Sequence, residues 1–317
     1  MSKLTGRYLA RDLVTADLKG SSPLIENLLF ERDNTILLGK EKSSKSILAL
    51  QMACALSSGC PFLNSFNVPK PVDVVYLQAE GKLSGTRDNL LNMSRIVDVD
   101  LDRLMFLYYP SIPLDTKIGY TEIVSQINSW KRPEVIIIDP LYMAMSGDLK
   151  DDVASRRMVE NMRMLSETYQ ATLVLVHHAH RPVRREGVTI NEGDDAIFGS
   201  FVWKAFPDNL IMLEKVQGHK NNRRLSCSTQ RTGAIHEASE LVLIEPTPLY
   251  FELRGDGLPI DDLVLGNLDT EPMTVKMLSE KIKRTYHYVF NSLYRLQNQR
   301  KVVRLNPGKN PAYFIKT

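Results

Sequence analysis

Residues 39–46 of this 317-residue chain read Gly39-Lys40-Glu41-Lys42-Ser43-Ser44-Lys45-Ser46, and this motif is the strongest indication of the fold class. It follows an apolar run at residues 35–38 and precedes a helical pattern that begins at Ser46. It matches the phosphate-binding loop G-x-x-x-x-G-K-[ST] except at the second glycine, which is Ser44 here. A strand, a loop and a helix N-terminus in this order direct backbone amides at an anion. The stretch therefore predicts a nucleotide-phosphate site, and the other interpretation is a lysine-rich surface turn.

The residue types of this loop predict how it would hold ATP and Mg²⁺. Lys45 would reach the β- and γ-phosphates, and the Ser46 hydroxyl would bind Mg²⁺. The nucleotide contacts are expected from Gly39, Lys42, Ser43, Ser44, Lys45, Ser46 and Ile47. Ser44 places a Cβ where the loop favours a positive φ, which costs on the order of 1 kcal/mol.

Polar side chains also end three further apolar strands. Asp139 follows residues 135–138 and is expected to hold the magnesium shell, although an aspartate there can also be a helix cap. Glu80 follows residues 74–78 and is the candidate to orient the attacking water, with an ordinary loop acid as the alternative. In His177-His178-Ala179-His180, His178 is the candidate γ-phosphate sensor and His177 a structural residue. No cysteine or acidic partner at ligand spacing favours zinc there.

The order of these patterns predicts the fold class. Apolar runs alternate with helical patterns from residue 24 onward, and the runs read as strands buried on both faces. This predicts an α/β fold with a mostly parallel central sheet flanked by helices, extended antiparallel over residues 210–253. We expect three parts, namely an N-terminal segment at 1–23, an ATPase domain at 24–255 and a small domain at 256–317.

Composition excludes several classes of protein. The chain is 43% hydrophobic and 24% charged, which excludes a collagen-like or mostly disordered chain. No apolar run reaches the roughly 18 residues of a membrane span, and the first residues lack the apolar core of a signal peptide. The three cysteines are too few and too scattered for a disulfide framework. We expect reduced thiols in a cytoplasmic protein without a membrane partner.

The last 45 residues differ from the rest in charge and rhythm. They hold ten Lys and Arg against one acid, a net charge of +9 in a chain whose total is +3. Helical patterns at 260–268, 274–282 and 285–299 precede two short strands, which describes a winged helix. Its third helix would enter a DNA groove, with Arg284 and Arg295 on the contacting side. A protein-binding module or a merely solvated basic surface would look similar.

These motifs, in this order and spacing, resemble the RecA-like ATPases over roughly residues Leu24 to Leu253. The likeness rests on GKEKSSKS, YLQAEG, IIIDP and LVLVHHAHR, and it points to the RepA branch of plasmid and phage hexameric replicative helicases, relatives of the DnaB and KaiC families. The resemblance implies an ATPase site made of Lys45, Ser46, Glu80, Asp139 and His178. It also implies a homo-oligomeric, hexameric ring in which a neighbour supplies a cation to the γ-phosphate; Lys220 and Arg223 are the candidates.

The same resemblance places two loops, residues 142–153 and 181–198, in a central pore that grips single-stranded DNA. Arg181, Arg184 and Arg185 in the second loop are the candidate phosphate contacts, and a solvated lid is the alternative. The sequence thus predicts a Mg²⁺-dependent ATPase ring that translocates on or unwinds DNA. The alternatives are a recombinase-like or loader ATPase that binds DNA without unwinding it, and a nucleotide-binding regulator with little turnover.

Overall fold

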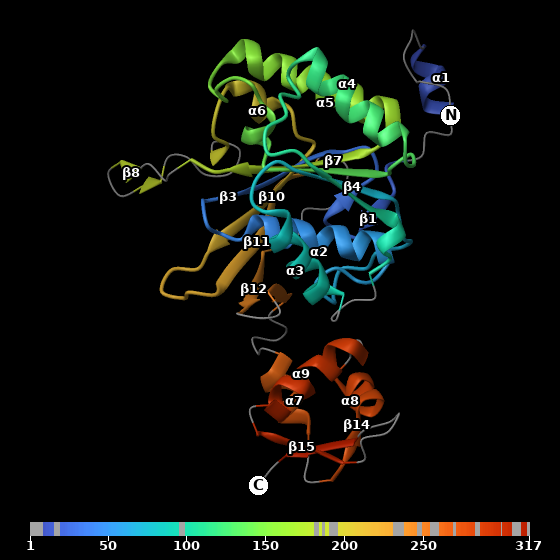
Figure 1. Ribbon diagram of the computed structural model, residues 1–317, viewed down its shortest axis with the longest axis vertical. Helices are drawn as coiled ribbons and strands as arrows, with labels where there is room; N and C mark the ends of the chain where they lie inside the picture. The colour runs from blue at the N-terminus through green and yellow to red at the C-terminus, as the bar shows by residue number, and fades with distance from the viewer. Residues whose placement is uncertain are drawn as a thin grey trace.

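The computed structural model describes residues 9–15, 20–94, 99–180, 184–185, 188–189, 196–230, 238–245, 249–253, 260–268, 271–282, 286–298, 300–305 and 312–315. Within these ranges the main body is a nine-stranded sheet with helices on both faces (Figure 1). Helices α4, α5 and α6 cover one face, and α2 and α3 cover the other (Figure 1). The predicted α/β class with a large, mostly parallel sheet is confirmed.

The strand order of the sheet is β13-β12-β11-β10-β3-β7-β6-β4-β5. The six strands from β10 to β5 pair in parallel, and β11, β12 and β13 continue the sheet antiparallel, as the sequence predicted. The strands are β3 (Asn34–Gly39), β4 (Val74–Gln78), β5 (Leu104–Tyr108), β6 (Val135–Asp139), β7 (Thr172–His178), β10 (Asn209–Lys215), β11 (Asn222–Gln230), β12 (Ser239–Ile244) and β13 (Tyr250–Leu253).

The helices begin where the sequence offers capping groups. Asp151 accepts hydrogen bonds from the amides of Val153 and Ala154 at the start of α5, and Thr116 accepts one from Gly119 at the start of α4. The helices of this body are α2 (Lys45–Ser58), α3 (Leu83–Met93), α4 (Lys117–Asn128), α5 (Asp152–Tyr169) and α6 (Phe201–Ala205), with short 3-10 turns η1 (Leu101–Arg103) and η2 (Leu141–Ala144).

Alternate strand residues supply two separate cores. Leu37 and Ile137 pack with α2 on one face of the sheet, while Leu38 and Ile138 pack with α5 on the other. Because both faces are apolar, polar groups are left to the strand ends. The register brings Gly39 beside His178 and pairs Gln78 with Asp139, so these ends meet at one edge.

Three small elements near the N-terminus and two after β7 complete this part. The hairpin of β1 (Pro23–Ile25) and β2 (Leu29–Phe30) was not predicted, although its apolar side chains are buried. Helix α1 (Ala10–Thr15) precedes it. The two-residue strands β8 (Arg184–Arg185) and β9 (Val188–Thr189) pair with each other.

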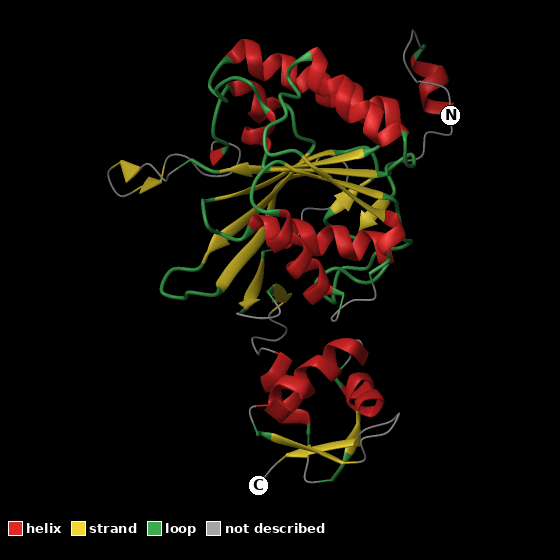
Figure 2. Cartoon of the chain, in the orientation of Figure 1, coloured by secondary structure: helices red, strands yellow, loops and turns green. Residues whose placement is uncertain are grey.

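In its described residues the C-terminal part holds three helices and a three-stranded antiparallel sheet of order β14-β16-β15 (Figure 2). Helix α9 contacts α7, α8 and β15, and Val264, Leu278 and Leu293 are fully buried. Thr274 caps α8 by accepting from the Met277 amide. The elements are α7 (Ile260–Asn267), α8 (Val275–Lys281), α9 (Tyr286–Asn298), β14 (Met273–Thr274), β15 (Val302–Leu305) and β16 (Ala312–Ile315).

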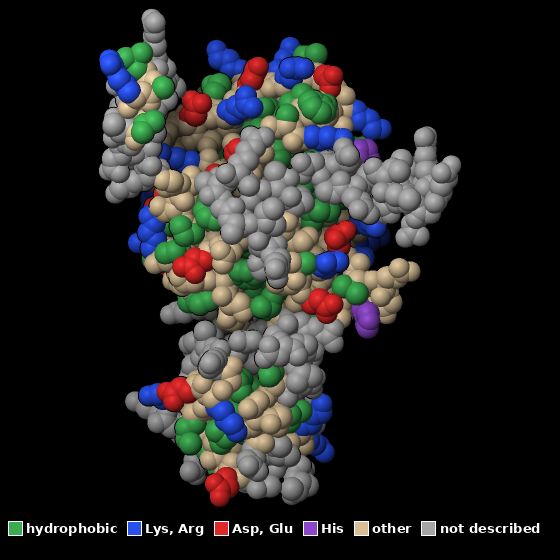
Figure 3. Space-filling model, turned by 180° about the vertical axis from the view of Figure 1, so that it is seen from behind, with side chains coloured by type: hydrophobic (Ala, Val, Ile, Leu, Met, Phe, Trp, Pro, Cys, Tyr) green, Lys and Arg blue, Asp and Glu red, His purple; other side chains and the backbone are tan. Residues whose placement is uncertain are grey.

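The surface offers no membrane-crossing element among the described residues, because none of their helices is both long and apolar enough. Seen from behind, basic and acidic side chains alternate over the helices at the top of the sheet (Figure 3).

His177 predicts a pH-dependent stability. Its ring is fully buried, donates from Nε2 to the Phe198 carbonyl at 2.8 Å, and burial lowers its pKa to about 4. The unfolded chain therefore binds a proton between pH 6.5 and 4 that the folded chain does not, so stability falls as the pH falls through this window. The loss approaches about 3 kcal/mol at pH 4.

Urea unfolding at several pH values measures this effect. The His177→Gln variant keeps a side-chain donor but does not titrate, so its stability should fall less over the same window. Equal pH dependence in both proteins would contradict the assignment.

Candidate active site

The phosphate-binding loop is a tight turn between β3 and α2. A Cβ on Gly39 would lie 2.5 Å from the Leu213 carbonyl oxygen and 2.8 Å from Ser43 Oγ, so only glycine fits where β3 ends. Lys42 and Ser44 adopt φ values of 60° and 71°. The positive φ expected at Ser44 is therefore present, and the loop closes although this position carries a side chain.

Lys45 is the first residue of α2, and its ammonium group lies against the backbone of the phosphate-binding loop. Its side chain is buried, and Nζ donates to the carbonyl oxygens of Gly39 at 2.8 Å and Lys40 at 3.0 Å. Nζ also lies 3.4 Å from His178 Nδ1. Burial lowers the pKa of Lys45 to about 8, and the carboxylates of Asp139, Glu41 and Glu80 oppose this shift. A bound phosphate would give the ammonium a strong negative partner in addition to these carbonyl oxygens.

Asp139 lies at the end of β6 beside the first turn of α2. Its Oδ1 accepts from Ser46 Oγ at 3.1 Å, and its Oδ2 accepts from the Tyr76 hydroxyl at 2.5 Å. Burial raises the pKa of Asp139, while the two hydrogen bonds and Lys45 act in the opposite direction. A hydroxyl beside a carboxylate is an oxygen donor set that suits Mg²⁺, which binds few protein ligands and keeps waters and phosphate oxygens. Ser46 and Asp139 therefore fit this cation.

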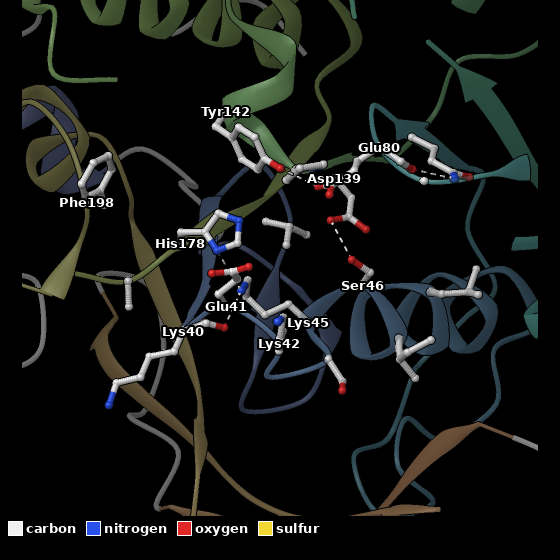
Figure 4. Close-up of a pocket in the computed structure, with 18 of the residues that line it drawn as sticks. Lys40, Glu41, Lys42, Lys45, Ser46, Glu80, Asp139, Tyr142, His178 and Phe198 are labelled. Atoms are coloured by element: carbon white, nitrogen blue, oxygen red, sulfur yellow. Dashed lines mark hydrogen bonds between the residues drawn. The ribbon is translucent and has the colours of Figure 1, made fainter. Parts of the chain in front are cut away.

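Glu80, Tyr142 and His178 line the same cavity, where Glu80 lies beside Asp139 and His178 lies beside Lys45 (Figure 4). The exposed Glu80 side chain accepts at Oε2 from the Tyr142 hydroxyl at 2.7 Å. The Tyr142 ring packs against the His178 ring, with centroids 5.2 Å apart. Burial, followed by the effect of Lys45, lowers the pKa of His178, which favours a neutral ring that accepts from the lysine.

Eight of the residues predicted for the nucleotide site line one cavity of about 1400 Å³. The members predicted from sequence are Lys42, Ser44, Lys45, Ser46, Ile47, Glu80, Asp139 and His178. Gly39 and Ser43 do not line the cavity; their carbonyl oxygens accept hydrogen bonds from Lys45 and Arg223. Tyr76 and Tyr142 were not predicted as members of the site. The available signal for Tyr76 was its place two residues before Gln78, the last residue of the strand that leads to Glu80. Among the described residues no group of three His, Cys, Asp or Glu could hold a metal.

Arg223 does not take the exposed position that a trans-acting finger needs. It is buried, and Nε donates to the Ser43 carbonyl at 3.0 Å while another guanidinium nitrogen donates to the Lys220 and Asn222 carbonyls. It thus braces the phosphate-binding loop of its own chain. Lys220 is exposed and lies 2.8 Å from Glu245. A role for either residue in a neighbouring site stays a prediction.

Of the predicted DNA contacts, the structure describes only the backbones of Arg184, Arg185 and Arg295. Arg181 and Arg284 lie outside the described residues, and the side chains of Arg184, Arg185 and Arg295 are likewise not described. Their roles stay predictions. The loop after β6 is anchored at its base, where Ser146 donates through its amide and hydroxyl to Asp115.

Comparisons with known proteins gave a family match and likenesses to solved structures. The family model described as AAA domain matches residues 7–182. No curated protein matches the sequence. Among solved structures the chain is similar to the RadB recombinase, with 15% identity and a TM-score of 0.48 over 68% of this chain and 88% of that one. It is also similar to the KaiC-like protein PH0186 from Pyrococcus horikoshii OT3, with 14% identity and a TM-score of 0.48 over 74% and 97%.

The left-handed backbone at Ser44 predicts a ranking of variants. Ser44 makes no capping hydrogen bond from its side chain, so Ser44→Ala should leave the strain unchanged. Ser44→Gly removes the Cβ and should be more stable than Ser44→Ala by about 1 kcal/mol. Denaturant unfolding measures both variants, and a less stable glycine variant would show that the positive φ is absent in solution.

The lowered pKa of Lys45 predicts proton uptake when ATP binds. The phosphates raise the pKa of Lys45 again, so above pH 8 each binding event takes up nearly one proton. Affinity then falls by up to about tenfold per pH unit above pH 8. Calorimetry in buffers of different ionisation enthalpy measures this uptake. Lys45→Arg stays charged and should abolish it; uptake retained in that variant would assign the proton elsewhere.

Proposed function

Because the chain belongs to the AAA domain family and has the predicted RecA-like P-loop ATPase core, we propose that it is a Mg²⁺-dependent ATPase that acts on DNA. One observation carries the ATPase proposal. Lys45, the Ser46–Asp139 pair and the Glu80 carboxylate, which come from three strand ends up to 94 residues apart in sequence, line the same cavity. Each supplies a different requirement of phosphoryl transfer.

The residues divide the reaction between them. Lys45 neutralises charge on the β- and γ-phosphates, and Ser46 and Asp139 hold Mg²⁺, which adds further charge neutralisation when bound. Glu80 orients a water whose oxygen bonds to the γ-phosphorus as the bond to the β-γ bridging oxygen breaks. The water's proton passes to the carboxylate. The neutral His178 ring, held against Lys45, is placed to sense the γ-phosphate.

The proposal for DNA rests on charge and loop placement. The last 45 residues carry a net charge of +9 in a chain of +3, and a polyanion partner suits that surplus. Three helices and a three-stranded sheet are the elements of a winged helix, with α9 as the groove-entering helix. Arg284 and Arg295 would then contact double-stranded DNA, and Arg181, Arg184 and Arg185 would contact single strands.

We place this ATPase in a homo-oligomeric ring, hexameric as in the helicases that the sequence resembles. The exposed Lys220 is the better candidate for the cation given to a neighbour, because Arg223 is committed to its own loop. Lys220 would then leave its ion pair with Glu245 and bind the γ-phosphate in the neighbouring subunit's site. The specific activity proposed is translocation on or unwinding of DNA. The recombinase-like alternative uses the same site and differs in coating DNA without separating strands.

ATP hydrolysis with and without single-stranded DNA tests the proposal. We expect DNA to raise turnover, and Lys45→Ala and Glu80→Gln to abolish it. Glu80→Gln should still bind ATP, because Glu80 acts on the water, and its turnover should fall about 10²- to 10⁴-fold. Lys45→Ala should lose binding as well.

A forked duplex then separates the DNA activities. Directional strand separation that needs ATP supports the helicase, whereas saturating coverage of single strands without separation favours the recombinase-like alternative. ATP binding without turnover in the wild-type protein would contradict the ATPase and move the nucleotide-binding regulator to first place.

A further inference from the structure

We propose that Tyr142 is a positioning residue that holds the Glu80 carboxylate in the orientation needed to activate water; this rests on the ATPase proposed above. The phenol donates to Glu80 Oε2 at 2.7 Å, which leaves Oε1 to accept from a water. Glutamate has three rotatable bonds, and the Glu80 side chain is exposed. Without a fixed partner such a side chain samples several rotamers, few of which aim at one attacking water.

Tyr142 is itself held by a rigid element. It lies on η2, between Leu141 and Ala144, which are both fully buried. The Leu114 amide donates to the Ala144 carbonyl at 2.8 Å, and the Met143 amide donates to the Pro140 carbonyl. The backbone that carries the phenol is thus fixed to the edge of the sheet, which favours a positioning role over that of a mobile gate.

The backbone of Glu80 is fixed from the opposite side. Gln78 Nε2 donates to the Glu80 carbonyl at 2.8 Å, and Thr86 Oγ1 donates to Gln78 Oε1 at 2.7 Å. The Ala79 amide donates to the Asp139 carbonyl. Both ends of the Tyr142–Glu80 hydrogen bond therefore start from anchored main chain, and the bond removes the remaining freedom of the carboxylate.

The Tyr142 ring also defines the distance between the carboxylate and the sensor. One end of the side chain bonds Glu80 while its ring packs on His178, which in turn lies 3.4 Å from the Lys45 ammonium. One aromatic side chain thus spaces the water-activating group from the phosphate-binding groups. The pKa of Tyr142 is raised to about 12 by burial and by Glu80, so the phenol remains a donor at neutral pH.

Steady-state kinetics of Tyr142→Phe test the proposal. This variant keeps the ring on His178 and removes only the hydroxyl. We expect kcat to fall roughly 10- to 100-fold, as for loss of a hydrogen bond to a charged group, with KM for ATP within twofold of wild type. The matched control is Tyr109→Phe, which removes a similar bond to Glu122 of 2.6 Å away from the cavity and should leave kcat unchanged.

A second measurement does not depend on turnover. In protein labelled with 3-fluorotyrosine, the ¹⁹F resonance missing from Tyr142→Phe belongs to Tyr142, and it should shift in Glu80→Gln, whose side chain replaces the charged acceptor. An unshifted resonance overturns the contact. An unchanged kcat, or a rise in KM equal to the fall in kcat, overturns the positioning role while leaving the ATPase intact. If the resonance shifts in Glu80→Gln but the wild-type protein does not hydrolyse ATP, the contact is present and both the proposed function and the positioning role are overturned.

Discussion

The parallel strands are buried on both faces of the sheet, and this burial determines where polar side chains can lie. Side chains such as Leu37 and Leu38 point to opposite cores, and neither face can accept a charge without a partner. Chemistry is therefore confined to the strand ends, where backbone groups are free and helices begin. Gly39, Asp139 and His178 are all at the ends of strands, and the register of the parallel pairs brings them together at one edge.

The phosphate-binding loop is closely packed, and it holds a buried positive charge. Gly39 has no room for a Cβ, Ser44 adopts a left-handed backbone, and Lys45 is buried among carbonyl oxygens. The buried Arg223 adds a hydrogen bond to the loop from β11, so a strand of the antiparallel extension supports the nucleotide site directly. Without a ligand, the loop already has the conformation that would bind an anion. Less binding energy is therefore lost to reorganisation when the anion binds.

The same arrangement connects the site to the parts proposed to act on DNA. Tyr142 lies three residues after Asp139 at the start of the first proposed DNA loop, and Phe198 lies at the end of the second. The Phe198 amide donates to the His178 carbonyl, and its own carbonyl accepts from His177. Each loop therefore begins or ends on a residue that contacts the edge of the sheet where Glu80 and His178 lie. In the proposed function, a displacement of either loop by DNA would be felt at Glu80 or His178 through direct contacts.

The phosphate-binding loop, the alternation of strands and helices, and the carboxylates at the strand ends could all be predicted from the sequence, because they depend on local residue order and on hydrophobic periodicity. The sequence also located α7, α8 and α9 to within a residue or two. The hydrogen bonds from Tyr76 to Asp139, from Tyr142 to Glu80, and from Arg223 to the loop of its own chain became evident only in the folded structure. These contacts join residues 62 to 180 positions apart. No spacing rule predicts them, because strand order and register, which depend on packing of the whole sheet, set which side chains meet.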